Sequence, residues 1–330
     1  MFTNIKKQAI ILHKRRILYL KVSYKKLFNI LKDRGITKTA LGNALDLSST
    51  TLAKLSKDEQ ISMNTLIGIC NYLNCQPGDI MELKYETDKN TLLYRLTEEK
   101  NAKLKGSIYH QTQIKLAYNS NHIEGSRLTE DQTRYIYETN TIGFDKEPVN
   151  IDDIMETINH FQCFDYMIEC ANNTLDEEFI KNVHKILKTN TSDSRISWFN
   201  VGEYKSRRNM VGDMKTVPPE KVKDEMNKLL EEYWKKQNIT LENILDFHVR
   251  FERIHPFQDG NGRVGRIIMF KECLKHNIVP FIIEDNLKMF YYRGLKEWDN
   301  EKGYLMDTCL TAQDRYKAYL DYFEIKYEKN

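Results

Sequence analysis

The chain has 330 residues, of which 41% are hydrophobic and 29% are charged, and its formal net charge is +3. This apolar content excludes a disordered chain, and the length is sufficient for one or two hydrophobic cores. We find no apolar run long enough to span a bilayer and no cysteine–histidine spacing typical of zinc, so we expect a cytoplasmic protein without membrane contact and with reduced thiols.

Positive charge is concentrated in the first 50 residues, which contain eleven Lys and Arg against only Asp33 and Asp46. Six of these basic residues lie in residues 1–21, where we expect a basic tail or an additional helix. An alternative is that translation begins at Val22, because a valine codon can initiate in bacteria. Any nucleic-acid partner is expected to bind in this region.

Residues 22–84 show short helical patterns separated by capping residues and turns. Thr37 can cap a second helix and Ser48 a third, with a tight turn between them, which predicts a helix-turn-helix. The second helix of that motif presents its first residues to the major groove. Here they are Ser49, Thr50, Thr51 and Lys54. A fourth helix, with Leu66, Ile67, Cys70 and Leu73 on its inner face, would close the bundle.

The same region resembles the Cro- and lambda-repressor-like helix-turn-helix domains, notably over residues 36–45 and 77–81. This resemblance implies that the chain binds DNA through its N-terminal domain. The alternative is a helical dimerisation or scaffolding bundle that no longer binds DNA. Residues 85–90 are polar and lack apolar periodicity, which predicts a linker to a second domain.

Residues 91–330 show helical periodicity almost throughout, so the predicted fold class is all-α. The expected helices cover residues 91–119, 151–171, 176–188, 220–236, 241–254, 263–276 and 286–298. Residues 110–123, which overlap the first of these ranges and extend beyond it, also show a helical pattern. The exception is residues 201–219, where glycines and prolines frame short strand-like pieces and predict a β-hairpin. His184 and His248 lie on predicted helices, and we expect both to be hydrogen-bonded core histidines.

One segment, residues 255–266, reads His-Pro-Phe-Gln-Asp-Gly-Asn-Gly-Arg-Val-Gly-Arg and contains several groups suited to phosphate chemistry. Its glycine spacing matches the dinucleotide-binding fingerprint, but that fingerprint follows a β-strand and this segment follows a predicted helix. An EF-hand is excluded because Phe270 stands where that loop needs a glutamate. The remaining interpretation is an anion cradle between two helices.

Four residues form the predicted cradle. Gly260 and Gly262 let backbone N–H groups approach an oxyanion, and the helix that opens near Arg263 adds its dipole. Arg263 and Arg266 lie three residues apart on one side of that helix, so both can face phosphate. These features predict a phosphoryl- or nucleotidyl-transfer site.

Two further side chains supply charge and a base. Asp259 suits a Mg²⁺ ion shared with phosphates, and His255 has the pKa range needed to take a proton from an attacking hydroxyl. Residues 255–266 also resemble the signature of the Fic family. That resemblance implies that His255 is the general base and that Asp259 holds Mg²⁺.

The Fic resemblance further implies how ATP is bound. Asn261 and the backbone of residues 260–263 would hold the α- and β-phosphates, while Arg263 and Arg266 would grip the β- and γ-phosphates. The implied reaction is attack of a protein hydroxyl on the α-phosphorus of ATP, which leaves AMP on the target protein and releases pyrophosphate.

The resemblance extends over about residues 91–330. Residues 201–205 and 209–219 resemble the family's flap, which pairs with a target segment as an added strand. The expected contacts at the flap are Val211, Gly212, Asp213 and Met214. Tyr291 and Tyr292 resemble the pair that lines the nucleoside side of the pocket, although Asp299 stands where an asparagine is common. Ordinary core packing is the alternative for both tyrosines.

Residues 120–125, at the end of the helix expected over 110–123, resemble the inhibitory motif of the same family. Ser120 and Glu124 lie four residues apart on one face of a predicted helix, just before Gly125. The helix dipole disfavours a carboxylate there unless a cation is near. The resemblance implies that Glu124 pairs with Arg266 and leaves ATP with its α-phosphate misaligned. The alternative is that Glu124 is an ordinary solvent-exposed glutamate at the end of a helix.

Three functions therefore stay open. The first is an AMP transferase joined to a DNA-binding module, and the second is a transcription regulator whose Fic domain senses nucleotide without modifying anything. The third is a hydrolase that removes AMP from a target with a water activated by a glutamate. The sequence also leaves open the nucleotide donor, the target and association with a second copy of the chain.

Overall fold

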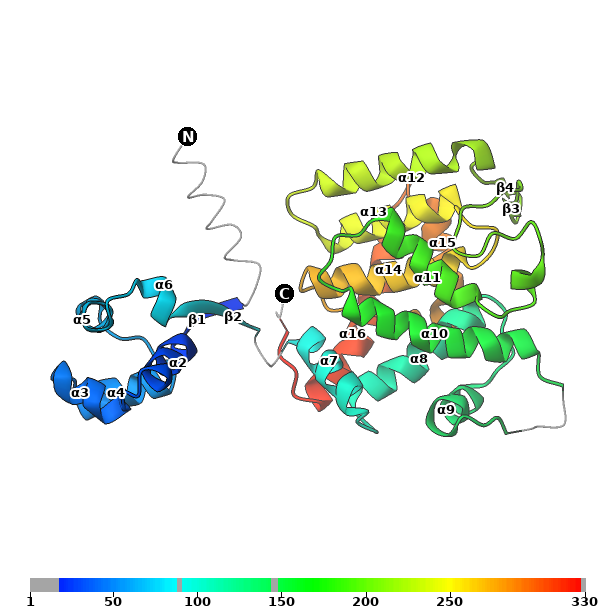
Figure 1. The fold of residues 1–330 in the computed structure, drawn as a ribbon. Coiled ribbons are helices and arrows are strands. Elements are labelled where there is room, and N and C mark those ends of the chain that lie inside the picture. The colour runs from blue at the N-terminus through cyan, green and yellow to red at the C-terminus, as the bar shows by residue number, and fades with distance from the viewer. Residues whose placement is uncertain (1–17, 88–90, 144–147, 328–330) are drawn as a thin grey trace. The chain divides into compact units, whose positions relative to one another are not determined.

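The computed structural model describes residues 18–87, 91–143 and 148–327, and the chain divides into two compact units, Met1–Lys89 and Asn90–Asn330. The described residues are mostly helical and form only two small antiparallel hairpins (Figure 1), which confirms the predicted all-α class. Most of the expected basic tail and residues 88–90 of the expected linker lie outside the described residues. None of the described helices is long and apolar enough to cross a membrane.

The N-terminal unit is a bundle of short helices with one hairpin. Its elements are β1 (Leu18–Ser23), α2 (Lys25–Asp33), α3 (Lys38–Ala44), α4 (Ser49–Ser56), α5 (Met63–Leu73), α6 (Pro77–Ile80) and β2 (Glu82–Thr87). The hydroxyls of Thr37, Ser48 and Ser62 each accept a hydrogen bond from the backbone N–H three residues later. These caps satisfy donors that every helix start leaves free, and they fix where α3, α4 and α5 begin.

Two features of this unit differ from what the sequence patterns indicated. Strands β1 and β2 pair antiparallel from Leu18 with Thr87 to Ser23 with Glu82, so regular structure crosses both predicted boundaries, at residues 21/22 and 84/85. The partners are far apart in the sequence, and local periodicity contains no information about such pairing. In α5, Leu66, Cys70 and Leu73 are buried as expected, but Ile67 is 48% exposed and Ile69 is buried in its place.

The C-terminal unit contains the remaining elements. They are α7 (Leu92–Ala102), α8 (Ile108–Ile123), α9 (Glu130–Thr139), α10 (Ile151–Glu169), α11 (Glu177–Lys188), η1 (Asp193–Arg195), β3 (Met210–Val211), β4 (Met214–Lys215), α12 (Pro219–Trp234), α13 (Leu241–Ile254), α14 (Asn261–Lys275), η2 (Asp285–Leu287), α15 (Lys288–Glu297) and α16 (Gly303–Tyr322). The predicted hairpin is present as β3 and β4.

Helix α14 is the centre of this unit. It packs against α8, α10, α11 and α13, and it lies among these helices in Figure 1. Every residue from Asn261 to Leu274 is buried, including two arginines. A buried charge is costly unless it is paired, so the surrounding helices must supply counter-ions to α14.

The helix boundaries differ from prediction in three places. The expected helix 91–119 is two helices, because Lys103 adopts a left-handed backbone conformation (φ 51°) and ends α7. Helices α9 and α16 were not predicted. Helix α14 begins at Asn261, two residues earlier than expected, which places residues 261 and 262 within its first turn.

Candidate active site

The loop between α13 and α14 is held by its own backbone conformation and by a buried histidine. His255 ends α13 with φ 52°, and Gly260 precedes α14 with φ 81°, a conformation that favours glycine. The ring of Phe257 stacks on His184 with 3.9 Å between ring centroids. His184 donates from Nε2 to the Asp259 carbonyl (3.2 Å) and accepts at Nδ1 from the Gly202 N–H (2.9 Å), as expected of a satisfied core histidine.

Asn261 closes the loop from inside. Its Oδ1 accepts from the Phe257 N–H (2.8 Å) and its Nδ2 donates to the Phe257 carbonyl (3.0 Å). The side chain is buried, so its amide is committed to the loop backbone. The side chain of Asn261 therefore shapes the loop from which residues 260–263 are expected to contact phosphate.

His255 lies partly buried at the start of the loop. Its Nδ1 is 3.3 Å from the Glu252 carbonyl oxygen. A carbonyl can only accept, so Nδ1 carries the proton and Nε2 keeps a lone pair. Burial, followed by the nearby Lys205 ammonium, lowers the pKa of His255. Both effects favour the neutral imidazole that a general base requires.

Asp259 is bound on one oxygen by two cations. Lys188 Nζ lies 2.7 Å from Oδ2 and Arg263 NH2 lies 3.0 Å from the same atom. Both cations also contact Glu156, through Lys188 Nζ at 2.6 Å and through Arg263 NH1. The four side chains thus form a closed ring of alternating charge, called the charge ring below. Burial raises the pKa of Asp259, but Arg263 and Lys188 outweigh it and hold that pKa well below its usual range.

The guanidinium of Arg266 is bound by residues at the end of α8. Arg266 donates from Nε to Ser120 Oγ (2.9 Å) and from NH2 to the Ser120 carbonyl (2.8 Å) and Glu124 Oε1 (2.7 Å). A Cβ added to Gly262 would lie 2.1 Å from that Glu124 oxygen, so the carboxylate rests directly on the start of α14. We call these contacts the Glu124 clamp. Gly125 follows with φ 103° and ends the helix.

The hairpin is attached to the loop by buried polar groups. Lys205 Nζ donates to Asn209 Oδ1 (2.8 Å) and Thr216 Oγ1 (2.7 Å), and its backbone N–H donates to the Pro256 carbonyl (2.8 Å). Asn209 Nδ2 in turn donates to the Phe257 carbonyl (3.3 Å). Burial lowers the pKa of Lys205 to about 8. The hairpin itself is exposed, including Val211, Gly212, Asp213 and Met214.

Comparison with known proteins agrees with this geometry. Residues 174–273, which run from the turn before α11 through most of α14, match the Fic/DOC family, and residues 26–86 match the Cro/C1-type helix-turn-helix DNA-binding domain. The chain contains a Fic/DOC family domain. Its N-terminal unit contains a Cro/C1-type helix-turn-helix domain.

Two relatives illustrate the similarity of the Fic domain. The protein adenylyltransferase Fic of Nematostella vectensis is 27% identical over 190 residues, which are 54% of this chain and 42% of that protein. The protein adenylyltransferase fic-1 of Caenorhabditis elegans is 23% identical over 196 residues, 56% of this chain and 36% of that protein. The chain thus spans less than half the length of these relatives.

Solved structures share the fold at low sequence identity. A Fic domain containing signaling protein from Bacteroides thetaiotaomicron superposes with a TM-score of 0.57 at 21% identity, over 72% of this chain and 99% of that one. The Fic-1 structure from C. elegans gives 0.53 at 16% identity, over 90% and 84%. These matches show that the C-terminal unit has the fold of a Fic protein.

The two adjacent tyrosines expected at the nucleoside pocket, Tyr291 and Tyr292, have different surroundings. Tyr291 is buried, and its hydroxyl lies 2.5 Å from His248 Nε2. Tyr292 is 40% exposed and donates to the Ile123 carbonyl (3.2 Å), beside the Glu124 clamp. Asp299 forms an ion pair with Arg253 (2.8 Å) two residues before the loop.

A buried carboxyl near the clamp was not predicted. Glu252 lies in the last turn of α13, and its Oε1 is 2.9 Å from where a Cβ on Gly265 would stand. Its Oε1 has no hydrogen-bond partner among the described residues. Burial, followed by the Glu124 charge, raises the pKa of Glu252 to about 8, although Arg266 opposes this. Nothing in the local sequence distinguishes this glutamate from a surface one.

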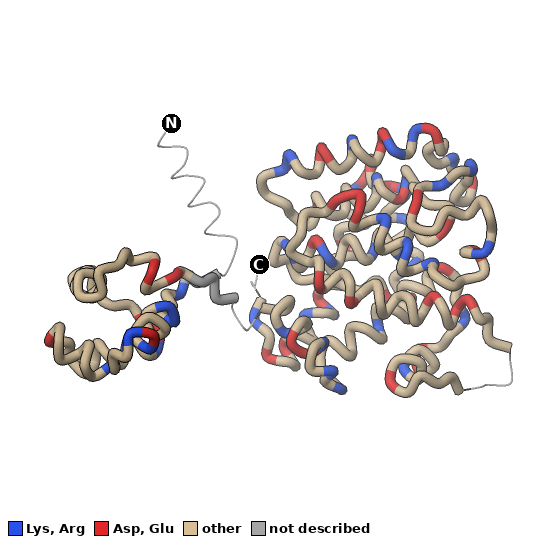
Figure 2. Tube along the Cα trace, viewed as in Figure 1, with Lys and Arg blue, Asp and Glu red and all other residues tan. Residues whose placement is uncertain are grey.

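The expected DNA-contacting residues lie on the first turns of α4. Ser49, Thr50 and Lys54 are exposed, and Thr51 is partly exposed. Helices α3 and α4 approach closely at Gly42, where an added Cβ would lie 2.6 Å from Leu52 Cδ1. Five of the eleven basic residues of residues 1–50 fall within residues 1–17, outside the described residues. In the Fic domain, positive and negative residues are interspersed along the helices (Figure 2).

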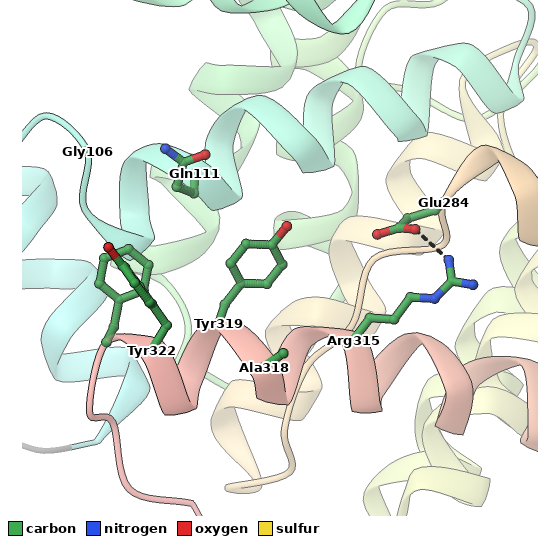
Figure 3. A pocket seen from close by; sticks show the side chains of 8 residues that line it. Gly106, Gln111, Glu284, Arg315, Ala318, Tyr319 and Tyr322 are labelled. Atoms are coloured by element: carbon green, nitrogen blue, oxygen red, sulfur yellow. Dashed lines mark hydrogen bonds and ion pairs between the residues drawn. The ribbon is translucent and has the colours of Figure 1, made fainter.

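A separate cavity of about 630 Å³ lies between α8, α16 and the segment before η2, and none of the predicted site residues lines it. Figure 3 shows Tyr319 and Tyr322 on α16 with the ion pair between Arg315 and Glu284. That ion pair measures 2.5 Å. The cavity is therefore distinct from the α13–α14 loop.

Proposed function

We propose that the Fic domain transfers AMP from ATP to a side-chain hydroxyl of a target protein. The observation that carries this proposal is the start of α14, where the loop residues His255, which is neutral, and Asp259, which is ionised, precede the Arg266 guanidinium. Asp259 is suited to Mg²⁺, because its side chain is 50% exposed and both cations make their closest approach to Oδ2. When bound, Mg²⁺ would neutralise phosphate charge. The names of the relatives, which are protein adenylyltransferases, support the same reaction.

The roles of the side chains follow from their chemistry. Nε2 of His255 takes the proton of the target hydroxyl as that oxygen attacks the α-phosphorus, and pyrophosphate leaves. The N–H groups at the start of α14 face the phosphates. The exposed edge of the β3–β4 hairpin pairs with the target segment and aligns its hydroxyl, and Asn209 links this hairpin to the loop.

We further propose that Glu124 restrains the reaction. Its carboxylate occupies Arg266, which is the group suited to the γ-phosphate, and it fills the space over Gly262. Because Glu124 and Arg266 belong to the same Fic domain, the restraint is intramolecular and independent of protein concentration. ATP bound against the clamp would hold its α-phosphate away from the line of attack.

Mass spectrometry after incubation with Mg²⁺ and a mixture of ATP, GTP and UTP tests these proposals. We expect an added AMP on the Glu124→Gly protein, or on proteins mixed with it, much less on wild type, and none on Glu124→Gly/His255→Ala. Equal labelling by wild type and Glu124→Gly, with both folded, would contradict the clamp. Nucleotide binding without labelling in any variant would favour the nucleotide-sensing regulator instead.

We also propose that the N-terminal unit binds DNA through α4. The support is the exposed first turns of α4 and the match to a helix-turn-helix DNA-binding domain. Fluorescence anisotropy of the full chain on its own upstream DNA should show affinity that falls with salt, as counterion release requires. Lys54→Glu should weaken binding, and the matched change Lys228→Glu, on an exposed position of α12, should not. Salt-independent or absent binding by the folded protein would overturn this proposal.

A further inference from the structure

Lys188 is a buried charged residue of the Fic domain that lies outside residues 255–266. It is the last residue of α11 and only 2% exposed, yet burial of an ammonium is normally costly. Burial lowers its pKa, but Asp259 and Glu156 outweigh burial and keep the pKa above its usual range. The ammonium is therefore a permanent charge inside the protein.

The surroundings of this ammonium resemble those of a bound cation. Its Nζ lies 2.6 Å from Glu156 Oε1, 2.8 Å from Asp193 Oδ2 and 2.7 Å from Asp259 Oδ2. These carboxylates come from three separate elements, namely α10, η1 and the catalytic loop. An ammonium has three N–H donors, so three carboxylate oxygens saturate it.

The same contacts determine how Asp259 is presented. Lys188 and Arg263 both make their closest approach to Oδ2, and Glu156 fixes the two cations from the other side. The carboxylate therefore cannot turn without breaking two ion pairs. Since both cations approach Oδ2, Oδ1 is the oxygen that these ion pairs leave for an added ion.

We propose that Lys188 is a positioning residue that acts as a built-in cation: it holds Oδ2 of Asp259, so that the carboxylate offers a divalent cation Oδ1 alone. This inference rests on the proposed function in that the divalent cation is the Mg²⁺ that accompanies ATP. Coordination through one carboxylate oxygen suits Mg²⁺, which binds few carboxylates, better than Ca²⁺, which takes more oxygens and often both of a carboxylate.

Thermal melting without nucleotide tests the cation-like surroundings. Lys188→Ala leaves the three carboxylates around an open space, so we expect its melting temperature to fall and to recover by about 5 °C in millimolar Ca²⁺ or Mg²⁺. Lys188→Met loses the same charge but fills the space, so its melting temperature should fall and should not recover when the cation is added. Wild type and Lys185→Met, an exposed lysine of the same helix, should not respond. Equal cation responses of Lys188→Ala and Lys188→Met would overturn the proposal.

Labelling in the Glu124→Gly background tests the positioning role. Lys188→Met removes a positive charge beside the metal ligand, so the half-saturating Mg²⁺ concentration should fall about tenfold. The maximal rate should fall as well, because Asp259 is no longer held, and Ca²⁺ should compete better against Mg²⁺. Lys188→Arg should restore part of the rate. A loss of stability with an unchanged Mg²⁺ requirement would mean that Lys188 is only structural. If Glu124→Gly itself labels nothing, the proposed function fails, and the melting experiment still decides the role of Lys188.

Discussion

Arg263 and Arg266 lie about one turn apart on the same buried helix, but their counter-ions come from different kinds of structure. Arg263 pairs with Glu156, whose side chain is 13% exposed within α10, and belongs to the closed charge ring. Arg266 pairs with Glu124, which is 31% exposed and caps the end of α8. The first arrangement can change only if several buried ion pairs break. The second can open by movement of one side chain.

The largest expected effect is on the stability of the folded protein when the counter-ion of Arg263 or of Arg266 is removed. Glu156→Ala removes one carboxylate from each of two buried cations, Lys188 and Arg263, so we expect the free energy of unfolding to fall by about 3–5 kcal/mol. Glu124→Gly should cost only about 0–1 kcal/mol, because its carboxylate is partly solvated and Arg266 keeps its bonds to Ser120. Denaturant unfolding measures both. A larger loss in Glu124→Gly than in Glu156→Ala would contradict the distinction.

The next effect is on nucleotide affinity. In a His255→Ala background, where no transfer occurs, Glu124→Gly should raise affinity for Mg²⁺-ATP by about 5–150-fold, the range of a typical coupling energy. Glu124→Gln keeps the bulk over Gly262 and removes the charge, so it should give an intermediate gain. Isothermal titration calorimetry measures each variant. Affinity that is the same in all three proteins would exclude competition between Glu124 and the γ-phosphate.

Glu252 gives the clamp a pH dependence that the charge ring lacks. Its folded pKa of about 8 is raised above its ordinary value, so the folded state binds a proton more tightly than the unfolded state does. The stability contributed by that proton is full below the unfolded pKa and is lost as pH rises to about 8. Between pH 5 and 8 wild type should therefore lose up to about 1.4 kcal/mol per pH unit more than Glu252→Gln does. Parallel pH profiles of the two proteins would exclude a protonated Glu252.

Sequence reasoning predicted the groups that act within a few residues of one another and missed those that act across the fold. The α13–loop–α14 segment and the caps at Thr37 and Ser48 follow from local patterns, and the ends of α13 were predicted to the residue. The Glu124–Arg266 contact was expected only through a family resemblance, since the two residues are far apart in the chain.

No sequence pattern or family resemblance predicted the charge ring. Lys188 and Glu156 lie on amphipathic helices, where a charged residue usually faces water, and only the packing of α10 and α11 on α14 buries them. The β1–β2 pairing was missed for the same reason, because register between distant strands is a tertiary property. Asn261 was predicted within this loop, but its side-chain bonds to the Phe257 backbone have no signal in the local sequence.

The smallest expected effect concerns His255 and its dependence on Lys205. Lys205 has a pKa of about 8, so it is charged throughout the acidic range and lowers the pKa of His255 there. A general base works only while it is neutral, so labelling by Glu124→Gly should fall as pH drops through the pKa of His255, below its ordinary value. Lys205→Gln keeps donors for Asn209 and Thr216 but removes the charge. It should move this acid limb to higher pH by at most about one unit. The matched exposed change Lys223→Gln should leave the limb in place, and an unmoved limb in folded Lys205→Gln would show that burial alone sets the pKa of His255.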